Sequence, residues 1–187
     1  TYEEPKLVSH SACHQSISLQ ACVDATPLVV LNDDNDDDVI YAACQGGMIV
    51  KLQAHSRAIL AHRYLHGWMI QADLISLEES KRLVVSAHSM DGKKGIVLVL
   101  SADLTMTHWE QVVDGPVKTA PVQLQNQLWV LAGSTVLALD VASGTRVQNI
   151  EIGLPHPCCT RPLFISKNDG SNHHHLVYAS SDWEACL

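Results

Sequence analysis

An all-β fold, an open β-propeller built of four-stranded antiparallel blades, is predicted by a pattern that occurs four times. Each copy begins with a short apolar segment, at 24–30, 71–75, 119–124 and 160–165. Matching positions lie 47 residues apart from Pro27 to Leu74 and from Leu74 to Pro121, and 41 residues apart from Pro121 to Pro162. A repeat of this length is typical of one propeller blade, so the pattern favours this fold over other all-β folds.

The remaining strands follow in the same order in each copy. Second strands mix β-branched and small residues at 39–44, 83–88, 128–133 and 176–181. Third strands are expected at 48–53, 96–101, 136–140 and, shortened by the chain end, 183–187. Outer strands are expected at 59–65, 106–113 and 146–152, and the fourth copy has none. Short strands of this composition, separated by turn residues, indicate antiparallel blades.

The strands divide the chain into two parts. Residues 1–22 are interpreted as a linker and the outer strand of a blade that lies mostly outside this chain. Residues 23–187 form the propeller segment, with blades at about 23–66, 67–114, 115–157 and, incomplete, 158–187. Because a propeller protects its sheet edges by closing its ring, we expect this open segment to be marginally stable in isolation and to self-associate.

Composition and charge limit the possible partners. The 187 residues are 47% hydrophobic and 17% charged, with no apolar run long enough to span a membrane. A net charge of −8, with 12 scattered basic residues, argues against nucleic acid and anionic membranes as partners. The first residue, Thr1, is not an initiator methionine, so the chain is expected to be an excised piece. Six cysteines without a CxxC pair fit a cytoplasmic protein with reduced thiols.

Two polar segments were weighed as metal sites, and neither carries a metal-site prediction. The acidic segment 32–38 lacks the ligand spacing of a calcium loop, so a hydrated hairpin tip is the preferred interpretation. Three consecutive histidines, His173 to His175, alternate in direction on a strand and cannot all face one ion. We therefore expect no catalytic, cofactor or metal residues in this segment.

The stretch 138–144, with Gly115–Val122 before it and the related segment 101–110, resembles the PQQ-like repeat. In that family a blade ends in Ala-x-Asp-x-x-Thr-Gly-x-x-x-Trp, and this chain has Ser143 for the threonine and Gln148 for the tryptophan. The first blade departs further, with Arg57 and Ala61 at the glycine and tryptophan positions. The structural repeat residues are taken as Pro27, Trp109, Pro121, Ala138, Asp140, Gly144 and Pro162. Trp109 is expected to be buried between the outer strands of adjacent blades.

Within this superfamily, the segments 22–30 and 39–52 look most like the start of the carboxyl-terminal propeller of beta-alanine-activating enzymes. Those are multidomain, ATP-dependent ligases of the acyl-CoA synthetase type. The resemblance implies that ATP and phosphopantetheine belong to upstream domains. It also implies that this segment is a noncatalytic module for protein interaction or substrate presentation, with other domains of its own chain or a protein as partner.

Two other functions stay open. The vicinal pair Cys158 and Cys159 is placed as in quinone-dependent dehydrogenases, where such a pair covers the quinone. The surrounding residues do not continue that match, and two buried apolar thiols are the simpler interpretation. A generic protein-binding propeller, unrelated to amino-acid activation, is the third possibility.

Overall fold

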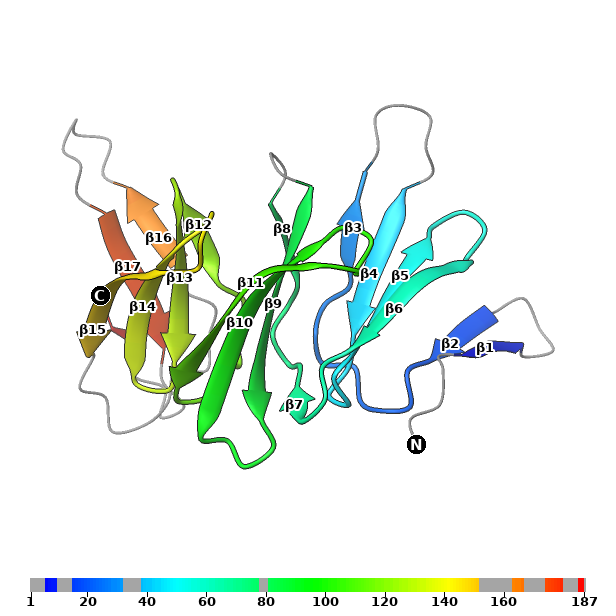
Figure 1. Cartoon of the computed structure of the whole chain (residues 1–187), viewed down its shortest axis with the longest axis horizontal. Helices are drawn as coiled ribbons and strands as arrows, with labels where there is room; N and C mark the ends of the chain where they lie inside the picture. The colour runs from blue at the N-terminus through cyan, green and yellow to red at the C-terminus, as the bar shows by residue number, and fades with distance from the viewer. Residues whose placement is uncertain are drawn as a thin grey trace.

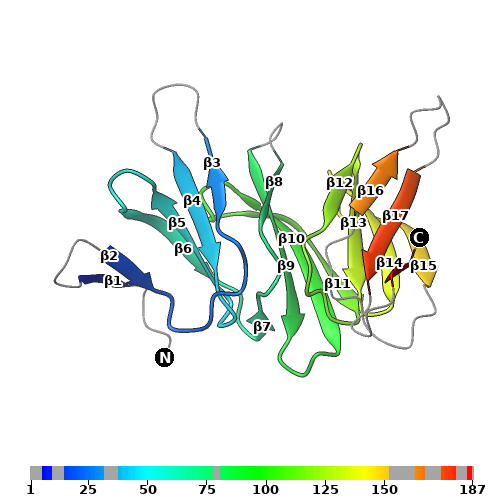
Figure 2. The same ribbon diagram turned by 180° about the vertical axis from the view of Figure 1, so that it is seen from behind.

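The computed structural model describes residues 6–9, 15–31, 38–77, 81–151, 163–166, 174–179 and 185–186. Secondary structure in these residues consists of antiparallel β-strands, without a helix. The sheets stand side by side in chain order, and the first and last do not meet, as two opposite views show (Figures 1 and 2). The fold class is therefore an open, all-β propeller arrangement, as predicted. No helix in the described residues has the length and hydropathy of a membrane span.

Two sheets have four strands in chain order, as the repeat predicted. Blade 1 contains β3 (Leu28–Val30), β4 (Val39–Ala43), β5 (Met48–Gln53) and β6 (Ile59–Tyr64). Blade 3 contains β12 (Val122–Leu124), β13 (Gln127–Ala132), β14 (Thr135–Asp140) and β15 (Arg146–Glu151). Blade 4 is three-stranded, with β16 (Leu163–Ser166), β17 (His174–Ala179) and β18 (Ala185–Cys186).

Blade 2 differs from the predicted four strands because its innermost position is divided between two short strands. It contains β7 (Trp68–Met69), β8 (Ile75–Leu77), β9 (Arg82–Ser89), β10 (Lys94–Ser101) and β11 (Thr107–Asp114). The predicted inner strand at 71–75 lies mostly between β7 and β8. Eight-residue β9 is long enough to pair with β7 at Ser89 and His88 and with β8 at its other end.

The amino-terminal segment contains a hairpin of β1 (Lys6–Ser9) and β2 (Gln15–Ser18). Only the second of these strands was anticipated, from the alternation that begins at Ser16. Beyond β2, Leu19 packs with Cys44, Met48 and Val50 of blade 1. The hairpin therefore leads directly onto one face of blade 1.

Blades 1, 2 and 3 are held together by apolar side chains on the faces that meet. We call the side of a blade that meets the next blade its forward face, and the opposite side its back face. The forward face of blade 1 and the back face of blade 2 share one core, which includes Tyr41, Ile49, Val85 and Leu98. The forward face of blade 2 and the back face of blade 3 share another, which includes Trp109. Blade 2 is covered on both faces by its neighbours, and its strands β9 and β10 therefore have the longest continuous runs of buried residues.

A β-bulge recurs at the same place in three blades. It falls between Lys51 and Leu52, between Val99 and Leu100, and between Ala138 and Leu139. Counted from this bulge, Ala61, Trp109 and Gln148 are paired at the same level of their outer strands. The register thus places these three residues in equivalent structural positions, which the repeat alignment had matched.

Trp109 is buried, with 8% of its surface exposed, and it contacts blade 3. Its Nε1 donates a hydrogen bond to the carbonyl oxygen of Val141 at 2.9 Å. A Cβ atom at Gly144 would lie 2.4 Å from Cε3 of Trp109, and Gly144 has a φ of +71°. The indole therefore packs on the turn between β14 and β15, which is where these contacts lie, rather than between outer strands as expected. Glycine is needed there both for the backbone angle and for the approach of the ring.

The other predicted repeat residues lie in different surroundings. Ala138 and Pro121 are buried, whereas Pro27 is exposed. Asp140 accepts hydrogen bonds at Oδ1 from the backbone N–H groups of Ala142 and Ser143 and from the Ser143 hydroxyl. Pro162 lies outside the described residues. Asp140 is thus a turn-forming residue, which is a structural role.

Candidate functional site

A polar cluster joins blades 1 and 2 where the chain enters their inner strands. We call it the Asp24 cluster: Asp24, Gln45, Gln71 and His88. Oδ2 of Asp24 accepts hydrogen bonds from Nε2 of Gln45 and, at 3.3 Å, from Nε2 of Gln71. The carboxylate is satisfied by two neutral amide donors, one from each blade.

The cluster follows directly from the repeat. Asp24 and Gln71 are 47 residues apart, the same distance as Pro27 and Leu74. A second contact has the same spacing, because the backbone N–H of Thr26 donates to Oδ1 of Asp73 at 2.6 Å. Equivalent positions of adjacent blades therefore touch each other at this end of the sheets.

His88, at the end of β9, sits beneath this surface with only 5% of its area exposed. Its Nε2 lies 2.8 Å from Oε1 of Gln71, and its Nδ1 lies 3.0 Å from the carbonyl oxygen of Ser89. Because Nε2 of Gln71 donates to Asp24, Oε1 of Gln71 faces the ring. Each ring nitrogen thus lies within hydrogen-bonding distance of an oxygen atom, and a neutral imidazole, which carries one N–H, can donate to only one of the two. The contact with Gln71 links His88 to the Asp24 cluster.

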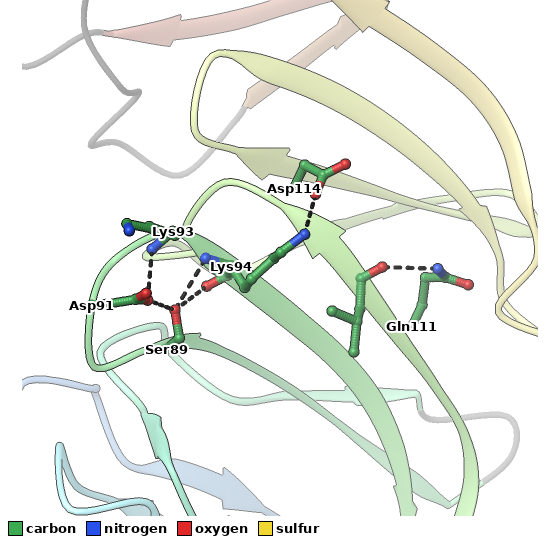
Figure 3. A network of polar contacts seen from close by, with 7 residues as sticks. Ser89, Asp91, Lys93, Lys94, Gln111 and Asp114 are labelled. Carbon is green, nitrogen blue, oxygen red and sulfur yellow. Dashed lines mark hydrogen bonds and ion pairs between the residues drawn. The ribbon is translucent and has the colours of Figure 1, made fainter.

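Next to this cluster, the turn between β9 and β10 is closed by side-chain hydrogen bonds (Figure 3). The Ser89 hydroxyl donates to Oδ1 of Asp91 at 2.6 Å, and the same Asp91 oxygen accepts the N–H of Lys93 at 3.1 Å. These bonds, that of Ser89 first, lower the pKa of Asp91. Nearby, Nζ of Lys94 is 2.5 Å from Oδ1 of Asp114 and lowers its pKa. The Asp91 bonds close the turn, whereas the Lys94–Asp114 pair joins the exposed ends of β10 and β11.

The opposite end of β10 has the same turn chemistry. The Ser101 hydroxyl donates to Oδ1 of Asp103, which also accepts the hydroxyl of Thr105 at 2.8 Å and its N–H at 3.1 Å. Together they lower the pKa of Asp103 to about 2, with the Ser101 bond as the largest cause. Both ends of this strand are therefore fixed by a Ser-x-Asp turn.

A groove of about 380 Å³ lies on the back face of blade 1. Its floor is formed by Ile40, Ala42, Val50 and Leu52, and one rim by the turn residues Ala54 and Arg57. The other rim comes from the amino-terminal segment, through residues such as Ile17 and Leu19. The lining is mainly apolar, which suits an apolar or aromatic side chain.

The residues weighed as sites in the sequence are only partly described. Cys158, Cys159 and His173, and residues 32–37 of the acidic segment, lie outside the described part of the chain. Within the described part, no group of three His, Cys, Asp or Glu side chains is arranged to hold a metal ion. Cys22 and Cys44 are free thiols, and Cys44 is buried with its Sγ 3.4 Å from the carbonyl oxygen of Leu19.

The Asp24 cluster was not predicted from the sequence, because no single motif marks it. The available signal was the equal offset of Asp24 and Gln71 from the aligned inner-strand residues Pro27 and Leu74. Polar residues at one repeat position converge when blades pack side by side. In blade 3 the matching residue is Lys118, which is exposed.

Comparison with known proteins identifies the fold. No family model and no curated protein matches the sequence. Among solved structures, BamB from Moraxella catarrhalis superposes with a TM-score of 0.58 at 15% identity, over 84% of this chain and 47% of that one. A quinohemoprotein alcohol dehydrogenase from Comamonas testosteroni matches with a TM-score of 0.64 at 10% identity, over 82% of this chain and 33% of that one.

The computationally designed protein Ika4 matches with a TM-score of 0.64 at 14% identity, over 90% of this chain and 91% of that one. This chain has a β-propeller fold. It spans about half of the BamB chain, and at these identities the likeness establishes the fold and not the chemistry.

Proposed function

We propose that the chain is a noncatalytic propeller module that binds another domain or protein within a larger ATP-dependent, amino-acid-activating enzyme. The parent enzyme would be of the beta-alanine-activating type that the sequence resembles, acting in the cytoplasm. ATP and phosphopantetheine would be handled by its upstream domains, and the propeller itself would hold no cofactor.

The observation that carries this proposal is the Asp24 cluster. Its carboxylate and amides are fixed by hydrogen bonds that cross from blade 1 to blade 2, and His88 holds Gln71 from below. Asp24 is exposed, and Gln45 and Gln71 are partly exposed. Prearranged polar groups on a rigid sheet suit recognition, because little side-chain freedom is lost on binding.

Binding to the adenylation and carrier regions of a beta-alanine-activating enzyme tests the proposal. We expect isothermal titration calorimetry to detect a one-to-one complex with the wild-type chain. Replacing Gln45→Ala should weaken binding about tenfold, the change expected when about 1.4 kcal/mol of contact is lost. The matched control is Gln111→Ala on the outer strand β11, which should bind like the wild type.

The same preparation also tests the noncatalytic assignment. ATP–pyrophosphate exchange with beta-alanine should occur with the adenylation region and not with the propeller alone. Absence of binding, or equal binding by the Gln45 and Gln111 variants, would contradict the proposed role of the cluster.

A further inference from the structure

The groove on the back face of blade 1 is narrowed at one rim by the amino-terminal segment of the same chain. There Leu19 packs on Met48 and on Val50, which is fully buried beneath it. The N–H of Gln45 donates to the carbonyl oxygen of Cys22 at 2.9 Å and joins this segment to the blade. The space that stays open is about 380 Å³. This volume lies in the range of small-molecule sites, so a compact ligand fits it.

The opposite rim of the groove carries a positive charge. Of the described residues that line the groove, Arg57 is the only charged one. Among the described residues, no hydrogen bond or ion pair engages its guanidinium group. From Val50, under the first rim, to Gln53, beside the second, is three residues of β5, or about 10 Å. The groove therefore has an apolar rim and a cationic rim, separated by the length of a small molecule.

Arg57 stands at a position where the backbone favours glycine. Its φ is +59°, an angle that a residue with a side chain adopts at an energetic cost. The turn is closed by backbone bonds, from the N–H of Arg57 to Gln53 at 2.9 Å and from the N–H of Gln53 to Ala58 at 3.0 Å. The corresponding turn of blade 3 has Gly144, with a φ of +71°. Because the turn forms without a side chain there, the strain at Arg57 points to a use of its guanidinium group at the groove.

We propose that the groove binds a small apolar carboxylic acid, with the carboxylate on Arg57 and the apolar chain on the open strand face. That face is formed by Ile40, Ala42 and Leu52, which are partly exposed. Covering them removes apolar surface from water, which favours binding. A guanidinium group forms two parallel hydrogen bonds with a carboxylate and repels an amine, so the charge of the rim selects an acid. The proposal is independent of the proposed function, because it concerns a surface other than the Asp24 cluster.

Octanoate is the probe that tests the site, on the full 187-residue chain. Titrated into the ¹⁵N-labelled chain, it should give saturable shifts of the amide signals of Ala42, Leu52 and Ala54. The signal of Val112, an exposed apolar residue on β11, should not shift. Octanamide has the same chain without the charge and should bind about three- to tenfold more weakly, the ratio expected for a charge-assisted contact at an exposed rim.

The role of Arg57 has its own variants and control. Arg57→Gln should bind octanoate and octanamide equally, whereas Arg146→Gln, which changes an exposed arginine on β15, should keep the preference for octanoate. Arg57→Gly should also lose the preference and yet unfold at a higher urea concentration than the parent, because glycine relieves the backbone strain. That combination separates the role in binding from a role in folding. Far-UV circular dichroism checks that each variant is folded.

Three results would overturn the proposal. The first is the absence of saturable octanoate shifts at the groove, and the second is equal affinity of the parent chain for octanoate and octanamide. The third is a dimer in sedimentation equilibrium whose formation shifts the same groove signals, because a second copy of the chain would then occupy the groove in place of an acid.

Discussion

The two described blade interfaces fill the space between their sheets with large side chains from different places. Between blades 2 and 3, the large side chain is Trp109 on the outer strand, and the turn opposite contains Gly144. Between blades 1 and 2, the outer strand has the small Ala61 at the equivalent position, and the turn contributes Leu104, which is 3% exposed and has a φ of +64°. The bulky residue has moved from the strand to the turn of the following blade.

The polar part of the interface is kept in both cases. A ring donor from the preceding blade reaches the carbonyl after the third strand, from Trp109 in one interface and from Tyr41 in the other. Arg63 adds hydrogen bonds to the Leu104 carbonyl at 3.1 Å and to Oγ1 of Thr107 at 2.6 Å. The loss of tryptophan in blade 1 is thus compensated at its forward face, because Leu104 supplies hydrophobic volume and Tyr41 supplies the capping bond.

Removing Trp109, the large side chain on the outer strand β11, should lower the free energy of unfolding more than any other change considered below. Trp109→Ala leaves a cavity between blades 2 and 3 and is expected to lower the free energy of unfolding by about 3–5 kcal/mol. Urea unfolding followed by circular dichroism measures the change. A variant as stable as the parent would show that the interface of blades 2 and 3 does not depend on Trp109.

Gly144→Ala should destabilise by about 2–3 kcal/mol, because the methyl group meets the Trp109 ring and the backbone angle is unfavourable for alanine. Gly67→Ala is the matched control, since Gly67 has a φ of +82° and its added Cβ would meet nothing within 4 Å. The difference between the unfolding free energies of the two variants, measured in urea, gives the cost of the contact between the added methyl group and Trp109. In a Trp109→Ala background that difference should disappear.

Tyr41→Phe should reduce stability by about 1–2 kcal/mol, because it leaves the Ala102 carbonyl without its hydroxyl donor. Burial, followed by the charge of Asp103, raises the pKa of Tyr41. The parent should therefore lose stability as the pH rises through the unfolded tyrosine value, and the phenylalanine variant should lose less. Urea unfolding of both proteins at pH 7 and pH 10.5 measures the loss of stability on substitution and its dependence on pH. An identical pH response of the two proteins would contradict the role of the Tyr41 hydroxyl in the loss at high pH.

The smallest change in stability is expected for a substitution of Asp103, in the turn that contains Leu104. The pKa of Asp103 is lowered from 3.8 to about 2, so its hydrogen bonds add stability above the unfolded value and are lost as the pH falls toward 2. Asp103→Asn should make the melting temperature less dependent on acid over that range. A melting curve with the same acid dependence as that of the parent would exclude this contribution.

The sequence by itself determined the repeat, and through it most of the strands. Alternating and β-branched residues between turn residues specify local strands, and a constant spacing specifies how they recur, so blades 1 and 3 match their predicted strand order. Strand β1 and the division of the inner strand of blade 2 could not be predicted, because two- to four-residue strands carry little periodic signal.

Only the tertiary structure decided which residues of different blades meet. The Asp24 cluster, the contact of Trp109 with Gly144, and the bond from Tyr41 to Ala102 join residues 17 to 61 positions apart. Such pairs depend on the register of each sheet, on the position of its bulge and on the side by side packing of blades. Local propensity specifies none of these, because the free energy that fixes them comes from burial between sheets.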